Sequence, residues 1–267
     1  MYKIVTKRVL NPTIVEMDIL APEIAAKAKP GEFIILRVDE DGERIPLTIA
    51  GEDLAKGTVK IIFQIVGSTT YKLGQKKEGE SIQDFVGPLG RATELDGLKK
   101  VCIIGGGAGS AIAMPIAQEL HRRGATVHSI VGFRNKDLVI LEDEFKACSD
   151  ILKIMTDDGS AGEKGLVTNA LEALLNEGNV YDEVIAIGPI VMMKFVAKMC
   201  KEKGIKIVVS MNPIMIDGTG MCGGCRLTVG GKTKFACVDG PDFDGAEVDF
   251  DEARCRGGKI GRASCRE

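Results

Sequence analysis

Three cysteines and one aspartate near the C-terminus are the residues in this sequence best suited to bind a metal. Cys222 and Cys225 have the spacing C-x2-C, Cys237 follows, and four residues separate Asp217 from Cys222. Plant-type [2Fe–2S] loops have the spacing C-x4-C-x2-C with a distant fourth cysteine, so Asp217 stands where the first cysteine would be. Zinc also accepts three thiolates and a carboxylate. The spacing alone therefore fits either centre.

Glycines surround these four candidate ligands, at positions 218, 220, 223 and 224. Glycine lets the backbone wrap closely around a cluster and point N–H groups at its sulfurs. The segment 211–250 contains no long periodic element and is too short to form an apolar core of its own. We expect a bound metal to stabilise it.

A glycine-rich loop further upstream has the chemistry of a dinucleotide site. In "IIGGGAGSAIA", Gly106, Gly107 and Gly109 follow an apolar strand and open a helix, where the helix N-terminus favours a pyrophosphate. Ser110 replaces the third glycine of the G-x-G-x-x-G pattern, and Arg134 rather than an acidic residue follows the second strand. A glycine turn that only packs helix on sheet remains the alternative.

Two more loops fall at the carboxyl ends of predicted strands, where ligands collect in parallel sheets. The first is "TDDGSAG", which contains Asp157, and the second is "IGPIVMM". The second loop supplies the candidates Gly188, Pro189, Met192 and Met193. Core packing remains a plausible role for one of the two methionines.

The segment "RIPLT" combines a guanidinium, a rigid proline and a hydroxyl within a short extended stretch, from Arg44 to Thr48. These groups suit an anionic cofactor with a flat ring, although a surface arginine in a turn would look the same. Other short motifs follow it in order along the chain: "QIVGSTT", "GPLG", "GGGAG" and "GPIVMM".

Periodicity divides the chain into four parts. Residues 1–97 alternate apolar and polar side chains over short runs between turn residues, which predicts an antiparallel β-barrel or sandwich. Residues 98–210 alternate strand and helix patterns, which predicts a doubly wound parallel sheet. The metal-binding segment is 211–250. Residues 251–267 have no periodicity and are expected to form a disordered or non-native tail that includes Cys255 and Cys265.

Composition restricts the class of protein further. The 267 residues are 45 % hydrophobic and 27 % charged with a net charge of −3, which fits a soluble globular protein and argues against a nucleic-acid partner. The N-terminus lacks a signal-peptide pattern, so we expect a cytoplasmic protein whose eight cysteines form no disulfide framework. The uncharged run 101–118 contains Pro115 and several glycines, which favours a strand–turn–helix over a membrane span.

The order of the motifs over residues 1 to about 210 resembles the ferredoxin reductase-like flavoproteins, in which a barrel binds FAD and the next domain binds NAD(P). The resemblance implies that Arg44 and Thr48 bind the FAD phosphates and that Pro46 and Leu47 lie near the isoalloxazine. It implies a flavin pocket completed by Gln64, Val66, Gly67, Thr69, Gly87 and Gly90. It places NAD(H) at Gly106, Gly107, Gly109, Arg134, Asp157, Gly188, Pro189, Met192 and Met193. No catalytic acid or base is implied, because hydride passes directly between the two rings.

The C-terminal stretch from Asn212 to Gly245 resembles the electron-transfer subunits of dihydroorotate dehydrogenase and their relatives. It is most similar to the small NAD-binding subunits of NADH-dependent ferredoxin:NADP oxidoreductases, which use one aspartate and three cysteines as ligands. This context favours [2Fe–2S] over zinc. It implies hydride exchange between NAD(H) and FAD, and single electrons passing to the cluster. It also implies a larger partner subunit with a second FAD, [4Fe–4S] clusters and an NADP(H) site, through which ferredoxin reacts.

Two other functions stay open on the sequence. One is the electron-transfer subunit of a dihydroorotate dehydrogenase or a sulfide dehydrogenase-type complex, which a cysteine at position 217 would have favoured. The other is a nucleotide-sensing or scaffold protein held together by zinc, without electron transfer. The preference for NAD over NADP depends on the resemblance alone, since Arg134 is able to bind a 2′-phosphate.

Overall fold

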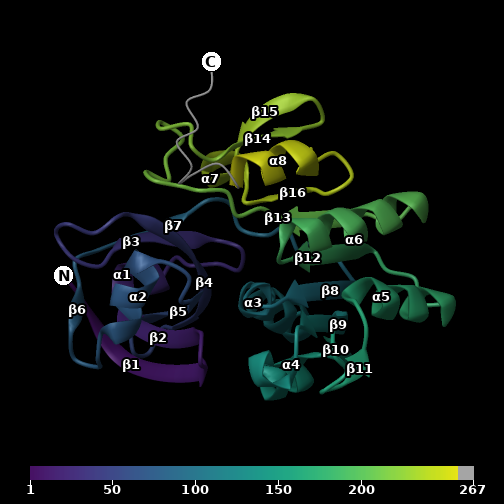
Figure 1. The fold of residues 1–267 in the computed structure, drawn as a ribbon, viewed down its shortest axis with the longest axis horizontal. Coiled ribbons are helices and arrows are strands. Elements are labelled where there is room, and N and C mark those ends of the chain that lie inside the picture. Colours follow the sequence, from purple (N-terminus) through teal and green to yellow (C-terminus); the bar gives the residue numbers. More distant parts are fainter. Residues whose placement is uncertain (258–267) are drawn as a thin grey trace.

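The computed structural model describes residues 1–257 and contains two seven-stranded sheets and one hairpin. Figure 1 shows the N-terminal sheet on one side and the second sheet with its helices on the other. The C-terminal segment lies across the top of both. In the part of the chain that the structure describes, no helix is long and apolar enough to cross a membrane.

The N-terminal sheet is antiparallel and has the order β6-β1-β2-β5-β4-β3-β7. Its edge strands β6 and β7 follow each other in the chain, so the sheet closes on itself as a barrel, as predicted. Alternating apolar residues fill its interior, with Phe63 and Phe85 among the largest. The strands are β1 (Tyr2–Asn11), β2 (Ile14–Leu20), β3 (Phe33–Arg37), β4 (Ile45–Asp53), β5 (Thr58–Gln64), β6 (Ser81–Ile82) and β7 (Asp84–Leu89). Two short helices, α1 (Pro22–Ala25) and α2 (Ser68–Gln75), complete the barrel.

The second sheet has the order β11-β10-β9-β8-β12-β13-β16 and is parallel except for β16. This confirms the predicted doubly wound domain, since its strands are apolar on both faces and helices cover them. Its elements are β8 (Lys100–Gly106), α3 (Gly109–Arg122), β9 (Thr126–Phe133), η1 (Lys136–Leu138), α4 (Glu142–Cys148), β10 (Ile151–Thr156), β11 (Glu163–Lys164), α5 (Val167–Asn176), β12 (Glu183–Ile187), α6 (Ile190–Glu202) and β13 (Ile207–Ser210).

The C-terminal segment is built onto the second sheet. Leu227, Phe243 and Phe250 belong to the same buried cluster as the side chains beneath α5 and α6, so the segment shares that core. Its strand β16 adds antiparallel to β13. The elements are β14 (Arg226–Val229), β15 (Lys232–Phe235), α7 (Ala236–Asp239), β16 (Asp242–Asp244) and α8 (Phe250–Gly257).

The prediction of an unstructured tail from residue 251 was wrong for residues 251–257, which are helical. Short-range contacts explain the helix: the Asp249 carboxylate accepts a hydrogen bond from the Glu252 N–H, and Arg256 pairs with Glu252 one turn away. Lys194 on α6 also donates to the Asp251 carboxylate at 2.7 Å. The remainder of the predicted tail, with Cys265, lies outside the described residues.

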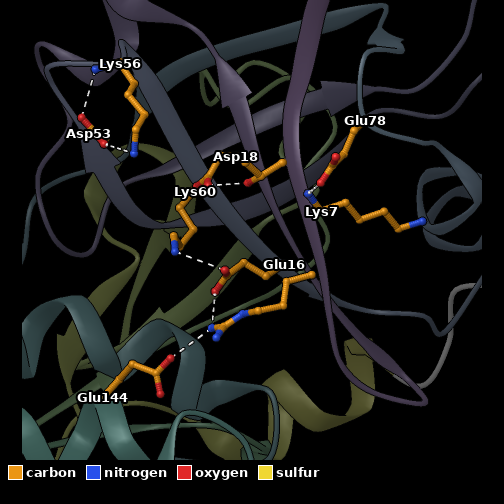
Figure 2. Close-up of polar contacts among 10 residues, drawn as sticks. Lys7, Glu16, Asp18, Asp53, Lys56, Lys60, Glu78 and Glu144 are labelled. Carbon is orange, nitrogen blue, oxygen red and sulfur yellow. Dashed lines mark hydrogen bonds and ion pairs between the residues drawn. The ribbon is translucent and has the colours of Figure 1, made fainter.

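A group of charged side chains joins the barrel to the second domain (Figure 2). Arg8 of β1 donates to Glu16 on the neighbouring strand at 3.1 Å and to Glu144 of α4 at 3.0 Å. Lys60 pairs with the second oxygen of the buried Glu16 at 3.2 Å. These contacts link the orientation of one domain to the other.

Candidate functional site

A cavity of about 1430 Å³ lies where the barrel, the parallel sheet and the C-terminal segment meet. One wall comes from β3, β4 and β5 of the barrel, and the opposite wall from the loops after β8, β9 and β12. These loops lie at the carboxyl ends of parallel strands, where such sheets bind ligands. The volume is sufficient for a large cofactor together with a second nucleotide.

The structure brings together most of the residues that sequence reasoning assigned to FAD and NAD(H). From the barrel, the cavity is lined by Pro46, Leu47, Thr48 and Gln64. From the second domain, it is lined by Gly106, Gly107, Gly109, Arg134, Asp157, Gly188, Pro189 and Met192. The two sets face one cavity although they are far apart in the sequence, which is the arrangement needed for direct hydride transfer.

The glycine loop is closely packed against the loop after β12. A Cβ on Gly106 would lie 2.5 Å from the Met192 sulfur, and a Cβ on Gly188 would lie 3.0 Å from the Gly106 Cα. Gly188 also has φ +159°, a conformation that side chains rarely adopt. Both loops therefore require glycine in order to bring their backbones together beside the ligand.

The departure from the G-x-G-x-x-G pattern has a structural explanation. The third glycine of that pattern lets helix and strand approach closely. Here Gly105 takes that part, because a Cβ on it would lie 2.7 Å from the Cα of Ser110. Gly109 does the same towards β12, since its added Cβ would overlap the Ile187 carbonyl oxygen. Serine at position 110 is thus compatible with a tightly packed dinucleotide loop.

Several predicted cofactor residues do not line this cavity. Met193 is 0 % exposed and packs in the core beneath α6, whereas its neighbour Met192 lines the cavity. Met193 therefore has the core-packing role that the sequence left open for one of the two methionines, and its assignment to the nicotinamide site stays a prediction. The other predicted residues outside the cavity lining are Arg44, Val66, Gly67, Thr69, Gly87 and Gly90.

The turn before α2 is closed by hydrogen bonds of its own. The Thr70 hydroxyl accepts hydrogen bonds from the N–H groups of Val66 and Gly67, each at 3.0 Å. Val66 itself is 76 % exposed. The assignment of Val66, Gly67 and Thr69 to the flavin pocket stays a prediction.

Arg44 contacts the candidate metal loop instead of the cavity. Its Nε donates to the Ile216 carbonyl oxygen at 3.0 Å, next to Asp217. The side chain is exposed, so it links the barrel to the cluster loop at the surface. The predicted contact between Arg44 and a cofactor phosphate stays a prediction.

The predicted metal ligands are partly assembled. The sulfurs of Cys225 and Cys237 lie 3.2 Å apart in a buried position, and burial together with the neighbouring Cys225 raises the pKa of Cys237. Cys222 is exposed. Asp217 accepts backbone hydrogen bonds from Thr219 at 2.8 Å and Cys222 at 2.6 Å, and these lower the pKa of its carboxyl. Within residues 1–257, no three such side chains converge on one point.

The chemistry of this loop fits an iron–sulfur cluster. Three thiols and one carboxylate that stays ionised can supply four anionic ligands, and iron binding deprotonates thiols whose pKa burial has raised. The Gly224 N–H already points at the Cys222 sulfur at 3.5 Å, as N–H groups do around cluster sulfurs. Gly218, Gly220 and Gly223 have φ of +76°, +85° and +66°, so the loop needs glycine to turn.

Sequence reasoning missed a third wall of the cavity. Ser210, Met211, Asn212, Met215 and Pro241 also line it. Ser210 ends β13 and the next three follow it, so the rule that located the loops after β8 and β12 would have found them. Pro241 comes from the C-terminal segment, and only the pairing of β16 with β13 brings it there.

Comparison with known proteins agrees with this arrangement. The family described as the iron–sulfur cluster binding domain of dihydroorotate dehydrogenase B matches residues 212–249. A Fusobacterium nucleatum dihydroorotate dehydrogenase B (NAD(+)) electron transfer subunit is 33 % identical over 231 residues, covering 83 % of this chain and 87 % of the relative. The chain belongs to this family of electron-transfer subunits.

Two further proteins have a higher sequence identity to this chain. The dihydroorotate dehydrogenase B (NAD(+)) electron transfer subunit homolog of Thermotoga maritima is 47 % identical over 250 residues, covering 94 % of this chain and 88 % of that protein. A chain in the solved structure of an NADH-dependent reduced ferredoxin-NADP oxidoreductase, studied for flavin-based electron bifurcation, is 45 % identical with a TM-score of 0.92. That match covers 97 % of this chain and 93 % of the other.

Proposed function

We propose that this chain is the NAD-side electron-transfer subunit of an electron-bifurcating NADH-dependent ferredoxin:NADP oxidoreductase. It is an oxidoreductase subunit with FAD, NAD(H) and an iron–sulfur cluster as cofactors. FAD supplies the conversion between a two-electron hydride and single electrons. The cluster type that we propose is [2Fe–2S], with Asp217, Cys222, Cys225 and Cys237 as ligands.

One observation carries this proposal: the cluster loop leads directly out of the cofactor cavity. Met215 lines the cavity, and Asp217 follows two residues later. Gly218 also packs against the barrel, since a Cβ on it would lie within 3.0 Å of the side chains of Leu89 and Ile35. Two residues before Ile35 on β3, Phe33 lines the cavity. The cavity and the candidate cluster site therefore share the same wall, so electrons have a short path between them.

The chain's own residues bind and orient the two rings. Pro46 and Leu47 on β4 shape the apolar face for the flavin ring, and Thr48 offers its hydroxyl beside them. On the opposite wall, the glycine loop and Gly188 allow the nicotinamide nucleotide to approach the backbone. No acid–base group is required for the transfer itself, because hydride moves between rings in contact.

The partner that we propose is the larger catalytic subunit of the complex, and its second FAD, [4Fe–4S] clusters, NADP(H) site and reaction with ferredoxin are part of the proposal. Around the cluster loop, Ile216, Met221 and Val238 are 53 %, 89 % and 43 % exposed. A Cβ on Gly220, next to Met221, would meet Val238, so Val238 lies against this part of the loop. Exposed apolar side chains of this kind suit a protein interface beside the electron exit.

The second candidate is the electron-transfer subunit of a dihydroorotate dehydrogenase, as named for several relatives. Asp217 favours the bifurcating complex, because the resemblance implies a cysteine at this position in the dihydroorotate branch. Association with the partner and oxidation of dihydroorotate by the complex would decide for the second candidate.

The test is spectroscopy of the anaerobically purified chain beside an Asp217→Cys variant. We expect flavin absorption and, after reduction, a [2Fe–2S] paramagnetic signal whose shape changes in Asp217→Cys. An Asp143→Cys variant is the matched control, since the Asp143 side chain is 96 % exposed and lies far from Asp217 in the sequence. Bound zinc with no iron, or the same signal change in both variants, would contradict the proposal.

A further inference from the structure

A carboxyl group lies directly behind the wall of the cofactor cavity. Asp242 of β16 pairs in register with Ser210 at the end of β13. Ser210 lines the cavity, and so does Pro241, the chain neighbour of Asp242. The carboxyl is therefore separated from the cavity by a single hydroxyl-bearing side chain.

The two oxygens of Asp242 have different surroundings. Oδ2 accepts a hydrogen bond from the Thr93 hydroxyl at 2.6 Å, on the segment that connects the barrel to the second domain. Oδ1 is inaccessible to solvent and, among the residues that the structure describes, has no hydrogen-bond partner. An inaccessible oxygen without a donor is costly for a carboxylate but suits a protonated carboxyl.

The surrounding charges act in the same direction. Burial raises the pKa of Asp242, the Ser210 and Thr93 hydroxyls lower it, and the Glu183 carboxylate raises it again, with a net rise. Glu183 comes from β12 and pairs with Lys206, and Asp244 and Glu94 also act on that pair. The Glu183 carboxylate thus adds to burial in favouring the neutral form of Asp242.

If the proposed function holds, the electron and proton counts leave one proton to be placed. A hydride carries two electrons and one proton, whereas an iron–sulfur cluster accepts electrons singly and no proton. Each NADH that is oxidised therefore leaves one proton in the cavity, and the reverse direction must supply one. The charged residues that line the cavity, Arg134, Asp157, Glu172, Lys198, Glu202 and Lys203, are all exposed on the nucleotide side.

We propose that Asp242 holds this proton at Oδ1 and exchanges it with the cavity through the Ser210 hydroxyl. In the oxidised protein Asp242 is neutral. When the flavin is reduced, Asp242 gives its proton to Ser210, whose own proton passes into the cavity, and the carboxylate remains. As two electrons leave through the cluster, the proton left from the hydride returns through Ser210 and forms the O–H bond on Asp242 again, while NADH has been oxidised and the electron acceptor beyond the cluster is reduced. When electrons enter from the cluster, the proton that Asp242 releases accompanies the hydride taken up by NAD⁺.

The test is the infrared difference spectrum between the oxidised and the reduced holoprotein, in H₂O and in D₂O. We expect a protonated-carboxyl C=O band that changes on reduction, shifts in D₂O and is absent in Asp242→Asn. Asparagine still accepts the Thr93 hydrogen bond, so a purely structural role would survive this substitution. The exposed Asp244→Asn, on the same strand, is the matched control and retains the band.

A second measurement is the midpoint potential of the bound flavin against pH. Because Asp242 gives up its proton when the flavin is reduced, linkage predicts that the wild type takes up one proton fewer per two electrons than Asp242→Asn over the pH range in which Asp242 titrates. This corresponds to a tenfold difference in the reduction equilibrium per pH unit. Identical pH dependence in the two proteins, or a carboxyl band retained in Asp242→Asn, would overturn the proposal.

Ser210→Ala keeps the test decisive where Asp242→Asn does not fold. In this variant the carboxyl band remains, but its change on reduction is lost because the link to the cavity is removed. An unaltered change would exclude the Ser210 route. A wild-type protein that binds no flavin or no iron contradicts the proposed function instead, so the two failures are distinguishable.

Discussion

The cofactor cavity and the cluster loop are organised in opposite ways. The cavity is enclosed by strands and loops whose packing fixes it, as the close approach of Gly106 and Gly188 shows. In the cluster loop, only Cys225 and Cys237 lie together, while Asp217 is bonded to its own backbone and Cys222 faces solvent. The fold alone forms the nucleotide site, whereas we expect the metal to complete the second site.

The largest expected effect is loss of the cluster while the cofactor cavity still binds FAD. Cys225→Ala removes one of the two buried thiols, so we expect loss of essentially all cluster iron while FAD remains bound at one per chain. Iron analysis and flavin absorption measure this directly. Cys255→Ala removes an exposed thiol on α8 and should retain both cofactors. Loss of FAD together with iron in Cys225→Ala would show that the two sites are not independent.

The reciprocal change is Gly188→Ala in the cavity. The added Cβ would meet Met192 and the Gly106 backbone at a φ that disfavours alanine, which costs about 2 kcal/mol, or roughly 30-fold in NADH affinity. NADH titration of the flavin absorbance measures the dissociation constant. Gly178→Ala is the matched control, since this glycine also has positive φ, +88°, but its Cβ would meet nothing within 4 Å. An unchanged affinity in Gly188→Ala would place the nucleotide elsewhere.

A smaller expected effect is a pH dependence of stability near the amino ends of the parallel strands, away from the cavity. His128 is buried, its Nδ1 lies 2.8 Å from the Tyr181 hydroxyl, and burial followed by Lys100 lowers its pKa. The unfolded chain therefore binds a proton more readily, so stability is present above the ordinary histidine pKa, about 6.5, and falls as the pH decreases through it.

Denaturant unfolding at several pH values checks this prediction. We expect the acid-side loss of the free energy of unfolding to be smaller in His128→Gln than in the wild type. His121→Gln, at the exposed end of α3, should leave it unchanged. Equal pH profiles for His128→Gln and the wild type would contradict the assigned cause, while the cavity and the cluster should respond to neither substitution.

The smallest expected effect concerns the charged contact between the two domains (Figure 2). Glu144→Gln removes one partner of Arg8, whose other partner Glu16 remains. Because this contact is partly exposed, we expect a loss of about 0.5 kcal/mol that disappears at high salt. Thermal unfolding at low and high salt measures it. Glu142→Gln is the control, because Glu142 pairs with Lys146 on the same helix. If domain orientation matters, Glu144→Gln but not Glu142→Gln should change the affinity for NADH.

Local patterns predicted the barrel and the parallel sheet because each strand or helix carries its own periodicity. Gly124, with φ +82°, follows the end of α3, as glycine often does after a helix. These patterns also predict the topology of the two sheets, and that topology places Thr48 and Gly107 in the lining of one cavity. Regular folds of this kind follow from the order of their elements.

Tertiary contacts explain what the sequence did not predict. Met193 and Met192 are chemically identical neighbours, and only the packing of α6 decides which one is buried. Arg44 contacts the Ile216 carbonyl across 172 positions of the chain, a separation that no local pattern reports. Asp242 lies behind Ser210 because β16 pairs antiparallel with β13. A strand of three residues is too short to show a periodicity from which this pairing could be predicted.

The most direct test of the central claim is rapid mixing of the anaerobic holoprotein with NADH, followed by optical and paramagnetic resonance measurements. We predict bleaching of the flavin absorption first and then the signal of a reduced [2Fe–2S] cluster, with neither change by NADH in flavin-depleted protein. Reduction of the cluster by NADH at the same rate without flavin would contradict this account, as would a flavoprotein that contains zinc and no iron.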